Sequence, residues 1–364
     1  MAGGARIHGV TPDPLAGRLF GWGRNYYGEV GLGDQEIYSS PVQVGSTKDW
    51  RIFTNFYYTS SGIRGGRLYR WGSGSNGVIG IGSIINYSSP VQIGAEADWA
   101  YVFGGAGSNS AGGLRGGRLF TWGYNPDGQL GLGDRTRRSS PVQVGAATDW
   151  VAGSVNDGTM LAIRGGKLFA CGANSQGQLG LGNVTKRSSP VQVGAATDWT
   201  AVAIDVAAYG LRGGALYSWG YDGLYGLLGD GTSSARRSSP VQVGAATDWT
   251  DIVVSGDHVN ALRGGMLFTW GRNGSGELGL GDRTDRWSPV QVGSETDWTS
   301  VSAGNGVSFG IRGGKLFAWG YGVNYQLGLG EAHGTISYSS PVQVGSDSDW
   351  KSVKSGELSA FALR

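Results

Sequence analysis

The sequence contains a single cysteine, Cys171, and only three histidines among its 364 residues. One thiol cannot form an internal disulfide framework or a four-cysteine zinc site. The histidines His8, His258 and His333 share no spacing typical of metal ligands, so we expect neither a metal nor a cofactor. No Ser-His-Asp or paired-carboxylate arrangement can be recognised, and the chain is therefore predicted not to be an enzyme.

The chain also lacks long apolar runs and a strong charge of either sign. No segment approaches the roughly 18 apolar residues that a membrane span needs, and the start of the chain has no apolar core typical of a secretory signal. We therefore expect a soluble protein without membrane insertion. Lysine and arginine number 29 and aspartate and glutamate 27, a formal net charge of +2. So weak a charge creates no strong field that would recruit a polyanion; binding to one is neither demanded nor excluded, and a nucleic-acid partner is not expected.

Glycine is abundant, with 70 residues, and it is accompanied by 14 Trp, 16 Tyr and 10 Phe. A disordered glycine-rich chain would not carry so many large apolar rings, so the composition indicates a folded protein.

One unit of about fifty residues is repeated along the chain. The tetrapeptide Ser-Pro-Val-Gln recurs seven times at intervals of 49 to 52 residues, with its prolines at Pro41, Pro90, Pro141, Pro190, Pro240, Pro289 and Pro341. Each copy is followed by an Asp-Trp pair and then by an arginine, which precedes Gly-Gly in six units, as at Arg164 and Arg312. The chain is therefore built from seven similar units.

Each unit contains four short segments with strand character. In the sixth unit they begin at Pro289 and continue with residues 297–304, 307–312 and 315–320. The Gly-Gly pair between the last two favours a tight hairpin turn. Adjacent apolar residues such as Leu316 and Phe317 suit a strand that is covered on both faces. Four antiparallel strands per unit, repeated seven times, predict an all-β, seven-bladed β-propeller.

The two ends of the sequence complement each other. The chain stops at Arg364, where the other units continue with Gly-Gly, and residues 17–23 supply the missing half of that unit. We therefore expect the last blade to combine residues 341–364 with a strand near residues 17–23, which would close the ring and remove an exposed sheet edge. Residues 17–364 are predicted to form a single propeller, and residues 1–16 an N-terminal arm.

The repeat resembles that of the regulator of chromosome condensation family. The pattern Trp-Gly-x-Asn-x-x-Gly-Gln-Leu-Gly-x-Gly is matched throughout by residues 122–133, and the copies at Trp22 and Trp270 differ by having Glu29 and Glu277 at the glutamine position. The resemblance covers nearly all of residues 17–364 and implies a propeller that serves as a binding platform. The family's best-known member is an exchange factor for the small GTPase Ran that docks on nucleosomes. Here only one unit keeps a histidine, His258, and the even spacing leaves no projecting wedge, so no exchange residues are assigned.

Positions that are identical in every unit are expected to be structural. The aspartates before tryptophan, such as Asp149 and Asp198, are expected to bond backbone amides at a strand start, and Asp34, Asp134 and Asp282 to be turn residues. Cys171 takes the place that six other units give to tryptophan, and we expect a small buried thiol there.

Information about binding is expected where the units differ, in the middle of each unit and in the loop before Ser-Pro. Three residues before the repeated proline the units read Tyr38, Tyr87, Arg138, Arg187, Arg237, Arg286 and Tyr338. In a closed ring the tyrosine units are neighbours, so one rim is predicted to have an aromatic and a basic sector. We define the aromatic arc as Tyr26, Tyr27, Tyr38, Tyr87, Tyr325 and Tyr338, and the basic arc as Arg135, Arg137, Arg138, Lys186, Arg187, Arg236, Arg237, Arg283 and Arg286.

The two arcs suit different partners. Clustered aromatics are typical of a protein interface or a sugar-stacking site, and arginine suits acidic partners. The alternative, which the sequence leaves open, is that these side chains only cover turns and keep the surface soluble.

The sequence thus predicts a non-enzymatic structural or binding component. Long runs shared between units, such as SSPVQVGAATDWT, resemble repeat proteins of bacteria and their phages. From these shared runs we predict a virion or bacterial-surface component, or otherwise a cytoplasmic protein. It would bind another protein or a host receptor or glycan, and would self-assemble or dock on a larger particle. The alternatives are a guanine-nucleotide exchange factor for a small GTPase and a chromatin or DNA-binding module that uses the basic arc.

Overall fold

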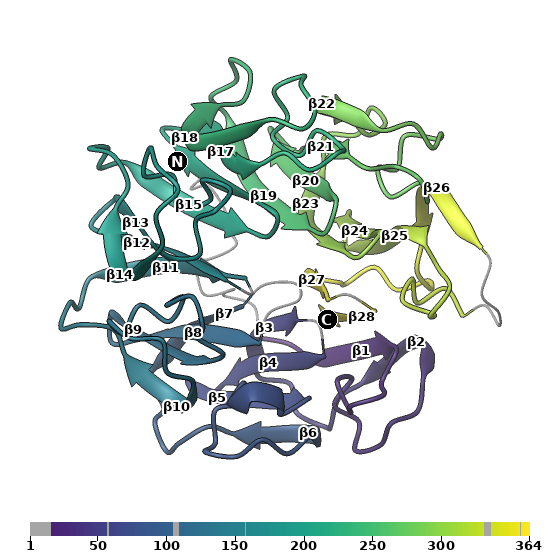
Figure 1. Cartoon of the computed structure of the whole chain (residues 1–364). Coiled ribbons are helices and arrows are strands. Elements are labelled where there is room, and N and C mark those ends of the chain that lie inside the picture. The colour runs from purple at the N-terminus through teal and green to yellow at the C-terminus, as the bar shows by residue number, and fades with distance from the viewer. Residues whose placement is uncertain (1–15, 57, 105–108, 157, 331–335, 357) are drawn as a thin grey trace, which may run out of the picture.

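A computed structural model describes residues 16–56, 58–104, 109–156, 158–330, 336–356 and 358–364. Within these ranges, seven four-stranded antiparallel sheets stand around a central axis, so the predicted all-β, seven-bladed propeller is confirmed (Figure 1). None of the described helices is long or apolar enough to cross a membrane.

The blades share one strand order from the axis outward. The innermost strands are β3 (Trp50–Phe56), β7 (Trp99–Phe103), β11 (Trp150–Val155), β15 (Trp199–Ile204), β19 (Trp249–Ser255), β23 (Trp298–Gly304) and β27 (Ser352–Ser355). The second strands are β4 (Thr59–Arg64), β8 (Ser110–Arg115), β12 (Thr159–Arg164), β16 (Ala207–Arg212), β20 (His258–Arg263), β24 (Val307–Arg312) and β28 (Ser359–Leu363).

The outer half of each blade follows the same pattern. The third strands are β5 (Arg67–Gly72), β9 (Arg118–Gly123), β13 (Lys167–Gly172), β17 (Ala215–Tyr221), β21 (Met266–Gly271), β25 (Lys315–Tyr321) and β1 (Leu19–Gly23). The outermost strands are β6 (Tyr87–Gln92), β10 (Arg138–Gln143), β14 (Arg187–Gln192), β18 (Arg236–Gln242), β22 (Arg286–Gln291), β26 (Ser337–Gln343) and β2 (Tyr38–Gln43). A short 3-10 helix, η1 (Ser75–Gly77), lies between β5 and β6.

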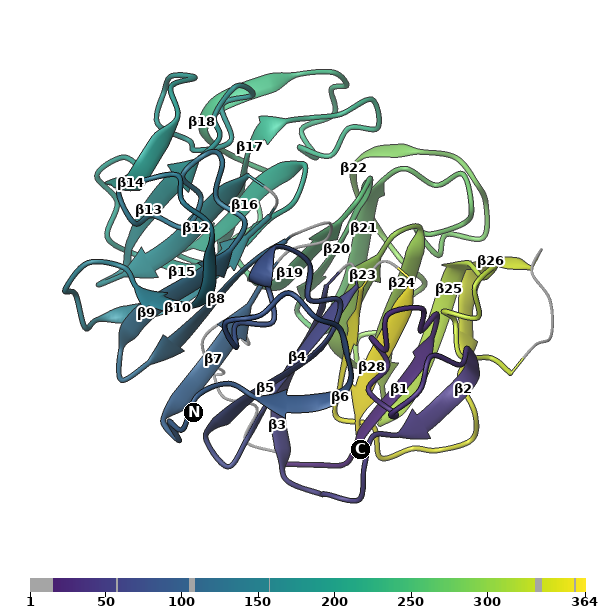
Figure 2. The same cartoon turned by 60° about the horizontal axis from the view of Figure 1, so that its bottom comes forward.

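The closing blade is made from both ends of the described chain. Its strand order is β2-β1-β28-β27, and Leu19 pairs with Leu363 while Gly23 pairs with Ser359. Figure 2 shows β28, in yellow, beside β1, in purple. The predicted closure is therefore confirmed. Apart from Ala16, the predicted arm of residues 1–16 lies outside the described residues, and its separation from the propeller stays a prediction.

The Gly-Gly pairs form the turns between second and third strands. Gly65 and Gly66 have φ angles of 54° and 72°, in the left-handed region that tight hairpins need. A Cβ on Gly66 would lie 1.9 Å from the carbonyl oxygen of Ala97, in the loop that enters the next blade. Glycine is thus required both by the turn and by the close approach of the two loops.

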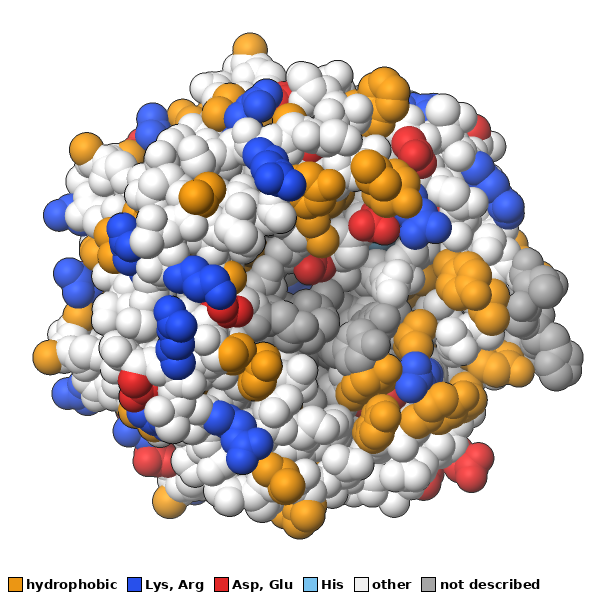
Figure 3. All heavy atoms as spheres, viewed as in Figure 1, with side chains coloured by type: hydrophobic (Ala, Val, Ile, Leu, Met, Phe, Trp, Pro, Cys, Tyr) orange, Lys and Arg blue, Asp and Glu red, His pale blue; other side chains and the backbone are white. Residues whose placement is uncertain are grey.

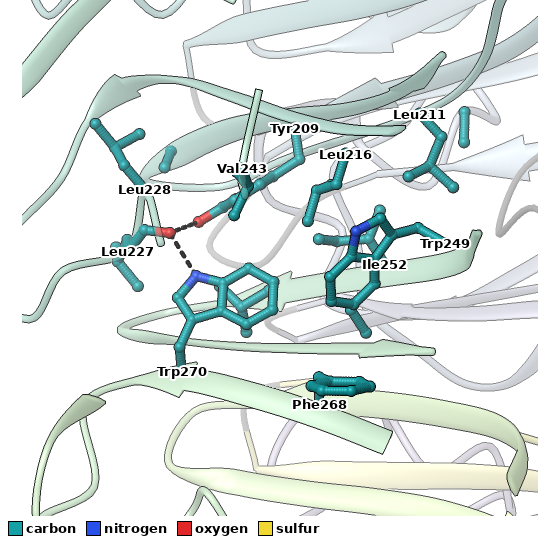
Figure 4. Close-up of a cluster of buried hydrophobic side chains, with 14 residues drawn as sticks. Tyr209, Leu211, Leu216, Leu227, Leu228, Val243, Trp249, Ile252, Phe268 and Trp270 are labelled. Atoms are coloured by element: carbon teal, nitrogen blue, oxygen red, sulfur yellow. Dashed lines mark hydrogen bonds between the residues drawn. The ribbon is translucent and has the colours of Figure 1, made fainter. Parts of the chain in front are cut away.

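The hydrophobic core lies between neighbouring blades. Six tryptophans from the third strands, Trp22, Trp71, Trp122, Trp219, Trp270 and Trp319, are fully buried. Each Nε1 donates to a carbonyl in the loop of the adjacent blade at 2.7–2.9 Å. Figure 4 shows one case, in which Trp270 and Tyr209 both donate to the carbonyl oxygen of Leu227.

Cys171 occupies the seventh tryptophan position, as predicted. Its thiol is fully buried and lies 3.7 Å from the carbonyl oxygen of Gln129, where the other blades have an indole N–H. Burial raises the pKa of the thiol far above its usual value, so it stays protonated and unreactive.

Candidate functional site

The two variable zones of the sequence meet on one face of the ring. In an antiparallel blade, alternate connections lie at opposite ends. The turns between first and second strands and the long loops between third and fourth strands therefore share one face, which we call the loop face. The Gly-Gly turns and the loops that end in Asp-Trp form the opposite hairpin face. Figure 3 shows the loop face, with hydrophobic side chains gathered towards β1, β2 and β26 and basic ones over the β9 to β14 side.

The long loops are held in shape by the asparagine and aspartate of the repeat. Asn125 accepts the N–H of Leu130 at 3.0 Å through Oδ1 and donates to the carbonyl of Asp134 at 3.2 Å. Asp134 in turn accepts the N–H of Thr136 at 2.8 Å, which lowers the pKa of its carboxyl. Asp34 and Asp282 make the equivalent contacts to the residue two positions further on. The prediction that these aspartates are turn residues is confirmed.

The three tyrosines at the start of outer strands, Tyr38, Tyr87 and Tyr338, lie in adjacent blades but are only partly exposed. Tyr38 and Tyr338 pack against the core between the β23–β26 blade and the closing blade, and Tyr87 packs against two neighbouring clusters. The hydroxyl of Tyr38 donates to Asp34 Oδ2 at 2.8 Å, and this hydrogen bond raises the pKa of the phenol. These tyrosines thus contribute to the blade seams, whatever else they contact.

The most exposed aromatic group in the arc surrounds an arginine that sequence reasoning missed. Tyr26 is 53% exposed, and the guanidinium of Arg24 lies 4.2 Å from its ring centre and 4.9 Å from that of Tyr58. Tyr27 packs on Tyr58 with 4.6 Å between ring centres. Beneath them lies Glu29, whose burial raises the pKa of its carboxyl. The only sequence signal for Arg24 is that its unit has glutamate where most units have glutamine, leucine or valine.

Tyr325 adopts a backbone conformation that the other units reserve for glycine. Its φ angle is 60°, and the equivalent residues are Gly28, Gly77, Gly128, Gly177, Gly226 and Gly276. A bulky residue in this region is strained by about 1–2 kcal/mol, and such strain is concentrated at functional sites. Tyr325 lines a small hollow on the loop face together with Ser39, Leu327, Leu329, Ile336 and Tyr338.

The basic arc contains two kinds of cation. Arg138, Arg237 and Arg286, at the start of outer strands, are half-buried and pair with loop aspartates at 2.5–3.0 Å. Arg135, Arg137, Lys186, Arg236 and Arg283 are exposed. Lys186 forms an ion pair with Asp127 of the neighbouring blade, and Arg236 lies 5.5 Å from the ring centre of Tyr221.

An exposed tryptophan was also missed. Trp287 is 50% exposed at the start of β22, where the other six units have serine. It lies against the preceding loop, since a Cβ on Gly226 would come within 2.4 Å of its ring. Leu224, in the same loop, is 68% exposed. The sequence signal for Trp287 is its single departure from the serine of the other units.

His258 belongs to a buried polar network between β20 and β24 of two neighbouring blades. Its Nε2 lies 2.9 Å from Ser308 Oγ, to which Asn260 also donates at 2.9 Å. Burial lowers the pKa of His258 to about 4, so the ring is neutral. Among the described residues no group of acidic, histidine or cysteine side chains could hold a metal ion, and His8 and His333 lie outside them.

The hairpin face, in contrast, repeats one cluster seven times. In each blade the arginine at the end of the second strand, or directly after it in the case of Arg364, pairs with the aspartate before tryptophan, with Nε–Oδ1 distances of 3.2–3.9 Å. The same guanidinium lies over the tryptophan ring, 5.2–5.8 Å from its centre. The partner of these aspartates is thus arginine, whereas the sequence led us to expect backbone amides.

Comparison with known proteins identifies the repeat. The model of the regulator of chromosome condensation (RCC1) repeat matches residues 16–53, 65–111, 116–154, 165–207, 213–262, 264–311 and 313–363. The curated ultraviolet-B receptor UVR8 of Arabidopsis thaliana is 31% identical over 186 residues, which are 50% of this chain and 32% of the receptor. The chain thus matches about a third of that relative's length.

Solved structures match over almost the whole ring. Prp20p of Saccharomyces cerevisiae is 20% identical, with 97% of this chain and 92% of that chain covered at a TM-score of 0.82. Human WBSCR16 is 18% identical, with 96% and 98% covered at a TM-score of 0.83. At these identities the likeness concerns the fold alone.

Proposed function

Because the chain belongs to the RCC1 repeat family, we propose that it is a non-enzymatic, protein-binding propeller whose loop face recognises the partner. One observation carries the proposal: the arginine-aspartate-tryptophan cluster of the hairpin face recurs in all seven blades, whereas the exposed or strained aromatic departures Tyr26, Tyr325 and Trp287 lie on the loop face. Binding residues are found disproportionately on loops that a rigid scaffold positions, so a loop face with these aromatic side chains suits recognition.

The aromatic arc supplies the features expected of a binding hot spot. Tyr26 is exposed over Arg24, and Tyr325 holds a strained conformation beside a hollow. Aromatic side chains lose little entropy on binding, and tyrosine, tryptophan and arginine are enriched among the residues that dominate interface energies. Within the arc we therefore favour Tyr26 and Tyr325 as the binding residues. Tyr38, Tyr87 and Tyr338 pack against the core between blades.

Site-specific photo-crosslinking tests this proposal in the cell that makes the protein. A photoreactive residue would replace Tyr26 or Arg137 on the loop face, and Lys315, an exposed residue next to a Gly-Gly turn, as the matched control. We expect crosslinked protein from the first two positions and none from the third. Crosslinks from Lys315 alone, or from none of the three, would overturn the proposal.

A second candidate is a regulator of the exchange-factor type. It is supported by the likeness to Prp20p, whose binding to Gsp1p and histones has been characterised, and by yeast RCC1 (Prp20) bound to Kap60. These matches favour this alternative over the virion or bacterial-surface role, which finds no support among these relatives. Release of a fluorescent guanine nucleotide from a Ran-type GTPase tests it. Faster release with the protein present would favour exchange, and an unchanged rate would exclude it for that GTPase.

A further inference from the structure

Three of the four arginines that lie three residues before the repeated proline, at the start of outer strands in the basic arc, are already neutralised. Arg138 pairs with Asp134 at 2.5 Å, Arg286 with Asp282 at 2.6 Å and Arg237 with Asp230 at 3.0 Å. Each aspartate also accepts a backbone N–H within its own loop. These arginines therefore hold their loops to the outer strands and have limited capacity for another anion.

The fourth unit differs at the position of the loop aspartate. Asn183 takes the position of the loop aspartate, accepts the N–H of Thr185 at 2.9 Å and contacts Asn174, as Asp134 and Asp282 contact the asparagines of their units. The loop keeps its shape, but the carboxylate charge is gone. Arg187 donates to the carbonyl of Lys186 at 3.2 Å, and no ion pair of Arg187 occurs within the described ranges. The asparagine thus releases the arginine without changing the turn.

The neighbouring loop adds to this positive charge. Residues 124–138 contain Arg135, Arg137 and Arg138 with Asp127 and Asp134, and residues 173–187 contain Lys186 and Arg187, so five cations face two carboxylates, a net charge of +3. The two loops are in contact, because the N–H of Gly133 donates to the carbonyl of Ser188 at 2.8 Å and Lys186 pairs with Asp127.

The loop of the closing blade has the opposite sign. Residues 24–38 contain Arg24 against Glu29, Asp34 and Glu36, a net charge of −2. The positive charge is therefore concentrated on two adjacent loops of one face, where it is strong enough to orient a charged partner.

We propose that the loops of residues 124–138 and 173–187 form one binding site for a carboxylate-rich segment of a partner protein, with Arg187 at its centre. This inference rests on the proposed function and names the partner's chemistry. Guanidinium groups bind carboxylates in a bidentate manner, which suits Arg187 and the exposed Arg135 and Arg137. A protein is favoured over nucleic acid because the excess charge ends within two loops and the flanking arginines are neutralised, whereas a phosphate backbone needs an extended basic track.

Two reciprocal substitutions test the site. Asn183→Asp restores the pairing that the sister units have, and Asp134→Asn removes it from the adjacent unit. The probe is a fluorescent deca-glutamate peptide, with deca-glutamine as the neutral control and a DNA duplex as the competing polyanion. We expect Asn183→Asp to weaken peptide binding by about three- to tenfold and Asp134→Asn to strengthen it by about threefold, because a charge-assisted hydrogen bond is lost or made available.

Each outcome decides the proposal. Thermal unfolding checks that both variants are folded. Arg187→Gln removes the guanidinium itself and should also weaken binding of the peptide. If the wild-type protein fails to bind deca-glutamate, or if both substitutions leave its affinity unchanged, the site does not exist as described. Tighter binding of the DNA duplex with the same dependence on residue 183 would replace a protein partner by a nucleic acid. If this site fails the test, crosslinks from a photoreactive residue at position 26 that persist in Asn183→Asp would still support the proposed function.

Discussion

The hairpin face and the loop face are built by the same seven units yet follow different rules. On the hairpin face every arginine has the same aspartate and tryptophan partners, so an average unit describes all seven. On the loop face Asn183, Tyr325 and Trp287 are each found in one unit only. Duplication thus preserved the contacts that hold a blade together while the opposite face diverged, and the two faces can be altered independently.

Two tryptophans eleven positions apart test that independence most strongly. Trp298, on the hairpin face, is 4% exposed, whereas Trp287, on the loop face, is 50% exposed. We expect Trp298→Ala to lower the free energy of unfolding by about 3–5 kcal/mol, since it leaves a large cavity. Trp287→Ser, which restores the residue of the other units, should change it by less than about 1 kcal/mol. Chemical denaturation measures both, and comparable losses would show that the faces are not separable.

The next largest expected effect is a loss of stability at acid pH, caused by the buried His258. Its pKa falls from 6.5 to about 4 on folding. Between these pH values the unfolded chain takes up a proton that the folded protein does not, so stability is lost as the pH falls, by roughly 3 kcal/mol for this group. We expect His258→Thr, the residue of two other units, to lose less stability between pH 7 and pH 4 than the wild type. Equal losses in urea denaturation at the two pH values would contradict this.

Replacing the repeated arginine of the hairpin face should lower the free energy of unfolding by a smaller amount. Arg263 stacks on Phe268 and Trp249, 4.5 and 5.4 Å from their ring centres, and pairs with Asp248 at 3.5 Å. Arg263→Ala is expected to lower the free energy of unfolding by about 1–2 kcal/mol, mainly through lost stacking, because the ion pair is exposed. Arg137→Ala on the loop face, which is exposed, serves as the matched control and should change it by less than about 0.5 kcal/mol.

The smallest effect is expected where strain and entropy oppose each other. Tyr325→Gly relieves the left-handed backbone of Tyr325 but increases the freedom of the unfolded chain, so the free energy of unfolding should change by less than about 1 kcal/mol. Partner crosslinking from residue 26 should nevertheless fall. The reverse change, Gly128→Tyr, should be much more costly, because a Cβ there would lie 2.6 Å from the Cα of Ser188. A large gain in stability together with unchanged crosslinking would remove the case for Tyr325.

The fold could be predicted because its signals recur in every unit. Gly65 and Gly66 predicted a turn by local chemistry, and the residues after Arg364 that the last unit lacks are supplied by β1. The pairing of Arg263 with Asp248 was missed, although both residues recur at fixed positions, because a partner fifteen positions away is identified only once the hairpin register is known.

The candidate site could be predicted only in outline. The sequence placed the tyrosine and arginine units in adjacent blades, but it could not distinguish Tyr38, which bonds Asp34, from Tyr26, which is exposed. That distinction depends on how each loop packs against the next blade. Asn183 and Trp287 were visible as departures from the repeat, but their importance depends on the contacts of the equivalent residues in the other units.

The shared closing blade also governs the order in which the molecule can assemble. β1 pairs with β28, so Leu19 cannot find its partner Leu363 until the intervening chain has been synthesised. Contacts between residues so distant in sequence form slowly. Until then β1 exposes an unpaired edge, which is the kind of surface that recruits the wrong strand. The other six blades are each made of strands consecutive in the sequence, so the pairing of β28 with β1 that closes the ring needs the last strand of all.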